Sequence, residues 1–352
     1  MGAVASYFAS LSLPGLFARI PAGVAQGLVW GLMALGVYIT FRLLDIADLS
    51  VDGTFSTGSA VVVMLILSGV NPWAATLIAM AAGLVAGTVT GLLHTKLGIP
   101  AILSGILTQY ALYSINLAIM GFKANQAVSV DKYALIISSR TIPKAILTGV
   151  LFSAAIIALL YWFFGTELGS SIRATGCNQQ MAKAQGININ SMKVLGLAIS
   201  NGLVAMAGAL SAQYSGFADV NSGRGAIVIG LAAVIIGEVI GEALLGKHLN
   251  FAGRLAFVVI GGILYYIVYT VVLWLKLDSN LMKLFTAVIV AIFLAVPYLR
   301  GQSKSSFRRA GKDAAASAVE AYDRDPYAWD KSENTDSAKS GDTADAADKG
   351  VK

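Results

Sequence analysis

Few side chains in this 352-residue chain have the chemistry that enzymes use, and those few stand apart from one another. There are two histidines, His94 and His248, and one cysteine, Cys177. Neither histidine sits at the spacing of a zinc site, and a single cysteine forms no disulfide within the chain. We therefore expect no catalytic residue, no metal site and no cofactor, and do not expect an enzyme.

One stretch imitates a phosphate-binding loop. From Gly241 to Lys247 the sequence matches G-x-x-x-x-G-K, but the motif then requires a Ser or Thr hydroxyl to hold Mg²⁺, and this chain has His248. The stretch also follows an apolar run long enough to span a membrane, whereas the motif follows a buried strand. We expect no nucleotide site here, so any use of ATP must come from another subunit.

The composition is that of a membrane protein with a polar C-terminal tail. Apolar residues make up 57% of the chain, charged residues 12%, and the mean hydropathy is +0.73. In soluble domains about a quarter of the residues are charged. Nine of the 25 Lys and Arg and ten of the 19 Asp and Glu follow Gly301. We expect residues 301–352 to form a disordered cytoplasmic tail, since they have few large apolar side chains.

Apolar runs of about 20 residues, the length that a helix needs to cross the hydrocarbon core, recur before this tail. They predict an all-α polytopic transmembrane bundle over residues 21–300, with about nine spans and eight or ten as alternatives. Residues 1–20, interrupted by Pro14 and without a cationic start, are expected to form an interfacial segment. The expected spans are residues 22–43, 53–70, 73–95, 100–121, 143–164, 194–215, 225–244, 252–274 and 282–299.

Glycines recur at four-residue spacing in several spans, which favours close packing of helix backbones in a membrane. They are Gly83, Gly87 and Gly91, Gly27 with Gly31, and Gly237 with Gly241.

The distribution of Lys and Arg bears on orientation. If the polar stretch at residues 165–193 is cytoplasmic, eight basic residues fall on each side of the membrane before the tail. Four more follow the last span directly, and these favour a cytoplasmic C-terminus. They are Lys304, Arg308, Arg309 and Lys312. Nine spans then place the N-terminus outside.

Residues 165–193 form the longest polar stretch between spans, with only four charged residues. Ser170 or Ser171 is expected to cap a short helix, and Gly176 and Gly186 to break it on either side of residues 178–185. A merely solvated connector would be richer in Lys and Glu. The pattern favours a cytoplasmic helix that docks on a soluble partner.

This stretch resembles the coupling loop of ABC-importer permeases, in the group that includes the branched-chain amino acid and ribose permeases. The pattern there runs, loosely, G-x-x-[LI]-R-A-x-G-x-N-x-x-A-A-x-x-x-G-I, and Met181 stands where a small residue is usual. Segments 43–55, 94–100, 213–220 and 228–238 resemble a less-studied branch associated with tryptophan/tyrosine-type binding proteins. The shared coupling-loop residues are Gly169, Arg173, Ala174, Gly176, Asn178, Ala182 and Gly186.

The resemblance covers about residues 20–300 and implies a permease subunit in a bacterial plasma membrane. Such a subunit moves a small, amino-acid-like solute, an aromatic one being a candidate, by alternating access. The implied partners are two copies of an ABC ATPase subunit, an extracytoplasmic substrate-binding protein or lipoprotein, and a second copy of the chain. Membrane lipid surrounds it, and no nucleic acid is implied. The shared residues would couple ATP binding to the movement of the spans.

Polar side chains within or beside the spans are candidates for the substrate path. A charge at the membrane centre costs about 2.5–3.5 kcal/mol on insertion scales, so each polar group there needs a partner. For the amides the alternative is an interhelical hydrogen bond, and for the glutamate it is an interfacial carboxylate held by water or Lys247. The candidates are Gln109, Asn116, Gln213, Asp219 and Glu238.

Three aspartates, Asp45, Asp48 and Asp52, precede the second span, where a helix N-terminus explains them without an ion. An ion-gradient-driven secondary transporter is the alternative function, and a channel a third. A secondary transporter is expected to show internal symmetry and an intramembrane carboxylate. Glu238 is the candidate for that carboxylate, and no clear internal repeat is visible.

Overall fold

A computed structural model describes residues 13–130, 132–246 and 250–274, with the single positions Leu284, Val288 and Ala291. The chain divides into two units, residues 1–294 and 295–352, and all described residues belong to the first. The expected tail lies outside the described residues, as do Lys247, His248 and all but three positions of the ninth expected span.

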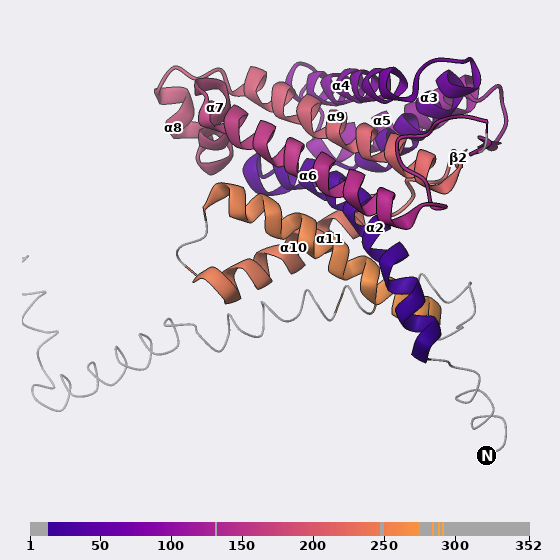
Figure 1. Cartoon of the computed structure of the whole chain (residues 1–352). Coiled ribbons are helices and arrows are strands. Elements are labelled where there is room, and N and C mark those ends of the chain that lie inside the picture. The colour runs from indigo at the N-terminus through magenta and orange to yellow at the C-terminus, as the bar shows by residue number, and fades with distance from the viewer. Residues whose placement is uncertain are drawn as a thin grey trace, which may run out of the picture. The chain divides into compact units, whose positions relative to one another are not determined.

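The described part of the chain is almost entirely helical (Figure 1), which confirms the all-α membrane bundle. Seven of the described helices are long and apolar enough to cross a membrane, and α3 is a shorter apolar helix of 17 residues. Each of the first eight expected spans coincides with one of them. The helices are α2 (Leu13–Tyr38), η1 (Ile39–Leu43, π-helical), α3 (Val51–Leu67), α4 (Pro72–Thr95), α5 (Ala101–Ile119), α6 (Ile142–Gly165), α7 (Glu167–Cys177), α8 (Gln179–Ala184), α9 (Ile189–Ser215), α10 (Ala226–Leu245) and α11 (Phe251–Trp274).

The first span is longer than the sequence indicated. Helix α2 begins at Leu13, runs through Pro21 and continues into the π-helical turn η1. Residues 13–20, which we expected to precede the first span, are therefore its first turns, and residues 1–12 lie outside the described residues. This π-helical turn carries Arg42.

Helix α9 is the centre of the bundle. It packs against α4, α3 and α2, and nearly every residue from Gly196 to Tyr214 is buried. The glycine stripe of α4 faces it, because a Cβ on Gly87 would meet the backbone oxygen of Leu197 and one on Gly91 would lie 2.8 Å from the Cα of Val194. The close packing expected from the glycine spacing is confirmed here.

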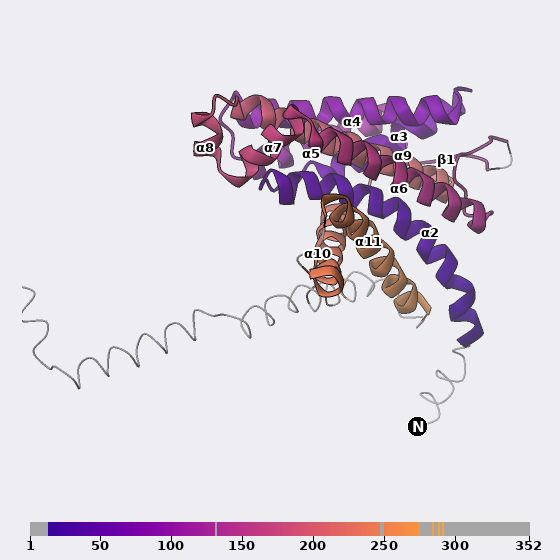
Figure 2. The same cartoon turned by 60° about the vertical axis from the view of Figure 1, so that its left-hand side comes forward.

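Helices α10 and α11 pack on α2 and lie on one side of it, with the rest of the bundle on the other (Figures 1 and 2). Glycines again set the approach. A Cβ on Gly31 would lie 3.0 Å from Val259 of α11, and one on Gly237 of α10 would meet the backbone oxygen of Phe257.

Two features mark opposite ends of the bundle. Helices α7 and α8 lie at one end, and the short strands β1 (Asn125–Ala127) and β2 (Phe217–Asp219) at the other (Figures 1 and 2). The strands are antiparallel, with Gln126 opposite Ala218, and tie the loop after α5 to the loop after α9. No pattern in the sequence predicted these strands. Below, these are called the helix-pair end and the strand end.

Candidate functional site

The polar stretch at residues 165–193 forms two short helices, each capped by the residue that precedes it. Thr166 Oγ1 accepts a hydrogen bond from Gly169 N at 3.3 Å at the start of α7, and Asn178 Oδ1 accepts one from Met181 N at 3.0 Å at the start of α8. The expected cap at Ser170 or Ser171 is wrong, because these residues lie inside α7. The expected break at Gly176 is wrong as well, since the break falls at Asn178.

Helix α7 is seated on the bundle through small and apolar residues. Ile172 is fully buried, and a Cβ on Gly176 would meet the backbone oxygen of Leu43, at the end of η1. A Cβ on Gly169 would meet the backbone oxygen of Phe163 in α6. Gly176 thus serves close packing, which explains why a glycine stands inside the helix.

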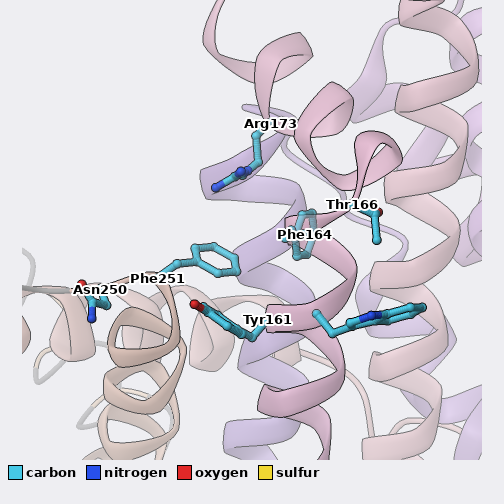
Figure 3. Close-up of a pocket in the computed structure, with 8 residues that line it drawn as sticks. Tyr161, Phe164, Thr166, Arg173, Asn250 and Phe251 are labelled. Carbon is cyan, nitrogen blue, oxygen red and sulfur yellow. The ribbon is translucent and has the colours of Figure 1, made fainter.

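Arg173 ties α7 to the start of α11. Its guanidinium lies over the ring of Phe251, with Cζ 5.7 Å from the ring centroid, an arrangement that attracts the cation to the aromatic face. Figure 3 shows Arg173 descending toward Phe251, with Phe164 and Tyr161 of α6 beside them. These residues line a cavity of about 630 Å³. The helix pair is therefore joined to η1, α6 and α11.

Helix α8 presents the exposed side of the pair. Met181 is 52% exposed while its neighbour Ala182 is fully buried. Asn178 is exposed and Ala174 half-buried. Gly186 ends α8 with φ +81°, a left-handed conformation that favours glycine. The seven residues singled out in the sequence thus fall into three groups. Gly169, Arg173, Gly176 and Ala182 pack against the bundle or the helix pair, Asn178 and Gly186 begin and end α8, and Ala174 is half-buried.

Glu238 also lies at the helix-pair end, where it pairs with a residue far away in sequence. Its Oε1 accepts from Arg42 Nε at 2.8 Å, and the two side chains are 18% and 50% exposed. The pair joins η1 to α10. Lys247, which we considered as the partner, lies outside the described residues.

The other path candidates separate into two groups. Gln109 and Asn116 line one cavity of about 590 Å³ beside the start of α3. Gln213 is buried and makes an interhelical hydrogen bond, donating to Thr76 Oγ1 at 2.9 Å, and it also accepts from Ile136 N at 3.1 Å. Asp219 lies at the end of β2, where its Oδ1 accepts from Asn221 N.

The sequence did not predict the partners of two aspartates. Asp52, in the first turn of α3, caps a different helix: its carboxylate accepts from Gly225 N and Ile227 N, both at 2.9 Å, at the start of α10. Asp48 is buried and accepts from Ser50 N and Oγ and, at 2.7 Å, from Asn201 Nδ2. A carboxylate beside an apolar run indicated that each aspartate needs a hydrogen-bond partner. It did not indicate that the partners are the start of α10 and Asn201.

Within the described ranges no group of three or more His, Cys, Asp or Glu could hold a metal ion. The stretch that imitates a phosphate-binding loop begins inside a helix, since Gly241 to Leu245 form the last turns of α10. The phosphate-binding motif requires a loop that follows a strand, and these residues are helical instead.

Comparison with known proteins identifies relatives over most of the chain. Residues 19–297 match the family described as branched-chain amino acid transport system / permease component. A tyrosine transport system permease protein of Clostridioides difficile (strain R20291) is 40% identical over 272 residues, which is 77% of this chain and 89% of the relative. An uncharacterised protein of Rickettsia prowazekii (strain Madrid E) is 34% identical over 77% of this chain and 94% of its own length.

A more distant relative is the autoinducer 2 import system permease protein LsrC of Yersinia pestis (strain Pestoides F). It is 29% identical over 61% of this chain and 60% of its own length. No solved structure matches the chain.

Proposed function

Since this chain belongs to the branched-chain amino acid transport permease family and is a permease subunit of an ABC importer, we propose that it carries aromatic amino acids such as tyrosine across a bacterial plasma membrane. A separate ATPase subunit, in two copies, drives the transport. The observation that most directly supports coupling between the ATPase and the spans is the packing of α7 and α8. One side of the pair is buried against the bundle and the other side is exposed.

The proposed docking surface for the ATPase is the exposed side of α8. Met181 offers an apolar side chain, 52% exposed, among exposed amides. A small apolar centre with a polar rim is the usual anatomy of a protein interface. A surface of this composition fits a groove in a soluble partner better than it fits lipid.

Movement of the docked pair reaches the spans through short, tight joints. One residue, Thr166, separates α6 from α7, and α8 is joined to α9 by a four-residue turn whose Asn188 caps α9 by accepting from Ser191 N. Gly176 rests on η1 and Arg173 on α11. A push on α8 would therefore be shared by α6, α9, α2 and α11 at once.

Partners and orientation follow from the same proposal. The helix-pair end faces the cytoplasm with the C-terminal tail, and the strand end receives substrate from an extracytoplasmic binding protein or lipoprotein. A second copy of the chain completes the permease as a homodimer, as ABC-importer permeases act in pairs. No nucleic acid takes part.

The substrate class is taken from the C. difficile relative, whose name states tyrosine transport. The ion-gradient alternative depended on Glu238 as a coupling carboxylate. Because Arg42 pairs with Glu238 at 2.8 Å and the family is one of ABC importers, we set that alternative aside.

Cys177, the single cysteine of the chain, is exposed at the end of α7 and serves as a natural reporter. A membrane-impermeant maleimide should label it in inside-out vesicles and not in right-side-out vesicles. Adding the ATPase subunit should slow the labelling. Labelling from the outside would refute the cytoplasmic placement of the helix pair.

The docking surface is tested by Met181→Asp. We expect this variant to weaken ATPase binding at least about tenfold, the effect of losing an interface contact of about 1.4 kcal/mol. ATP-driven tyrosine uptake into proteoliposomes should fall with it. Leu97→Asp is the matched control, because Leu97 is 68% exposed and its neighbour Lys96 lines a cavity with Asn188, at the same end. Normal assembly and uptake by the Met181 variant would sink the proposal.

A further inference from the structure

Two helices begin at one point in the interior of the bundle. Ser50, the residue before α3, contacts Asn201, near the middle of α9, so α3 begins about halfway along the bundle. Helix α10 begins at the same place, because Asp52 accepts from the backbone of Gly225 and Ile227. Helix N-termini that lie inside a membrane transporter often point at its ligand.

A cavity of about 590 Å³ opens at this point. Its lining combines one carboxylate, one guanidinium, amides and two phenol rings from α3, α5 and the turn before α10. The residues that matter here are Asp52, Gln109, Tyr110, Tyr113, Asn116 and Arg224. A volume of this size is in the range of small-molecule sites.

The two charged groups retain capacity for a ligand. A carboxylate has about four acceptor positions, and the two backbone donors occupy two of those of Asp52, which is only partly buried. Arg224 is exposed, and among the described residues it forms no ion pair. An anion alone would meet Asp52, and a cation alone would meet Arg224, so a ligand with both charges is favoured.

Asn116 gives an independent sign of a ligand. It is fully buried and lines the cavity, yet its Oδ1 has no hydrogen-bond partner, while its Nδ2 donates to Gly53 O at 3.3 Å. An unpaired buried acceptor destabilises the fold. Because Oδ1 has almost no accessible surface in this structure, a ligand's donor would reach it after a small rotation of the Asn116 side chain, and would then satisfy it.

We propose that this cavity is a binding station for the zwitterionic group of an α-amino acid inside the permease. Asp52 and Asn116 Oδ1 take the ammonium group, Arg224 takes the carboxylate, and Tyr110 with Tyr113 borders the side chain. The proposal deepens the proposed function and rests on it for the substrate class. It adds that the permease itself, and not the binding protein alone, recognises the amino acid.

The test is equilibrium binding of radiolabelled L-tyrosine to the full-length permease with its ATPase in nanodiscs, without ATP or binding protein. We expect saturable binding, with Asn116→Leu and Arg224→Gln each weakening it at least about tenfold, as loss of a hydrogen bond to a charged group does. Lys123→Gln, which removes an exposed cation outside the cavity, should bind like the wild type. Tyramine, without the carboxylate, and 3-(4-hydroxyphenyl)propionate, without the ammonium, should compete poorly.

Three outcomes overturn the inference: no saturable binding to the wild type, unchanged binding by both variants, or equal competition by either analogue. The thermal midpoint of Asn116→Leu gives a second measure. If it rises while tyrosine binding is unchanged, Asn116 is merely an unpaired group in the fold. ATP-driven tyrosine uptake by the wild-type complex with its binding protein is measured separately, so that failure of uptake counts against the proposed function and failure of binding against the station.

Discussion

Asp48 and Asp52 stand four residues apart, yet the bundle treats their carboxylates in opposite ways. Asp48 is enclosed, and three donors from Ser50 and Asn201 reach its two oxygens. Asp52 accepts two backbone donors and remains partly open to a cavity in which Asn116 has an unpaired oxygen. The first cluster is closed and the second is incomplete.

The difference separates a structural role from a binding role. A closed polar network fixes the position of residues 44–50 against α9 and has no capacity left for a ligand. An incomplete one keeps its capacity at a cost in stability, which a protein tolerates at functional sites. Changes in the Asp48 cluster should therefore damage folding, and changes in the Asp52 cluster should damage substrate handling.

The largest effect is expected from Asn201→Leu. It removes a donor to fully buried Asp48, which costs about 1–3 kcal/mol or more for a charged group, and it puts a branched side chain where Gly87 of α4 packs closely, which costs about 1–3 kcal/mol more. We expect most of the protein to be lost as aggregate in fluorescence-detected size-exclusion chromatography. Asn190→Leu, on the same helix at an exposed position, is the control and should behave like the wild type. A stable Asn201 variant would remove the distinction between the two clusters.

A smaller effect on stability is expected from Asp52→Asn. The amide keeps one acceptor oxygen for the start of α10 and turns a donor toward the other backbone N–H, at a cost of about 1–3 kcal/mol. The variant should elute as a folded protein with a lowered thermal midpoint. Its tyrosine binding should fall by a larger fraction than its yield of folded protein. The control is Asp45→Asn, because Asp45 is exposed and its φ of 55° is one that Asn also adopts. Aggregation of Asp52→Asn as severe as that of Asn201→Leu would contradict the proposed difference between the Asp48 and Asp52 clusters.

The smallest effect on stability is expected at the Arg42–Glu238 pair. Both side chains are partly exposed, and such pairs contribute about 0–1 kcal/mol. Arg42→Gln, Glu238→Gln and the double variant should lower the thermal midpoint only slightly. A double-mutant cycle on ATP-driven uptake then measures whether the pair matters to transport. A coupling energy near zero in uptake would mark it as a surface contact alone.

Much of the architecture could be predicted from local patterns. Eight of the expected spans coincide with helices, because hydrophobic length is a local property of the chain. The four-residue glycine spacing of α4 correctly indicated close packing, here against α9. The N-cap of α7 could not be predicted in this way, because Thr166, Ser170 and Ser171 are all residue types that cap helices. Only the structure shows that Thr166 Oγ1 accepts from Gly169 N.

The amino-acid sequence by itself determined that this is a helical membrane protein with a short polar helix between two spans, since composition and run length are local properties of the chain. The resemblance of residues 168–187 to a coupling loop added that it is a permease, and the structure showed that the polar stretch forms two helices. The tertiary structure decided which polar groups meet. Asp52 reaches the start of α10 across more than 170 residues, and Arg42 reaches Glu238 across 196. Such pairings depend on which helices become neighbours, and that choice is made by the packing of the whole bundle.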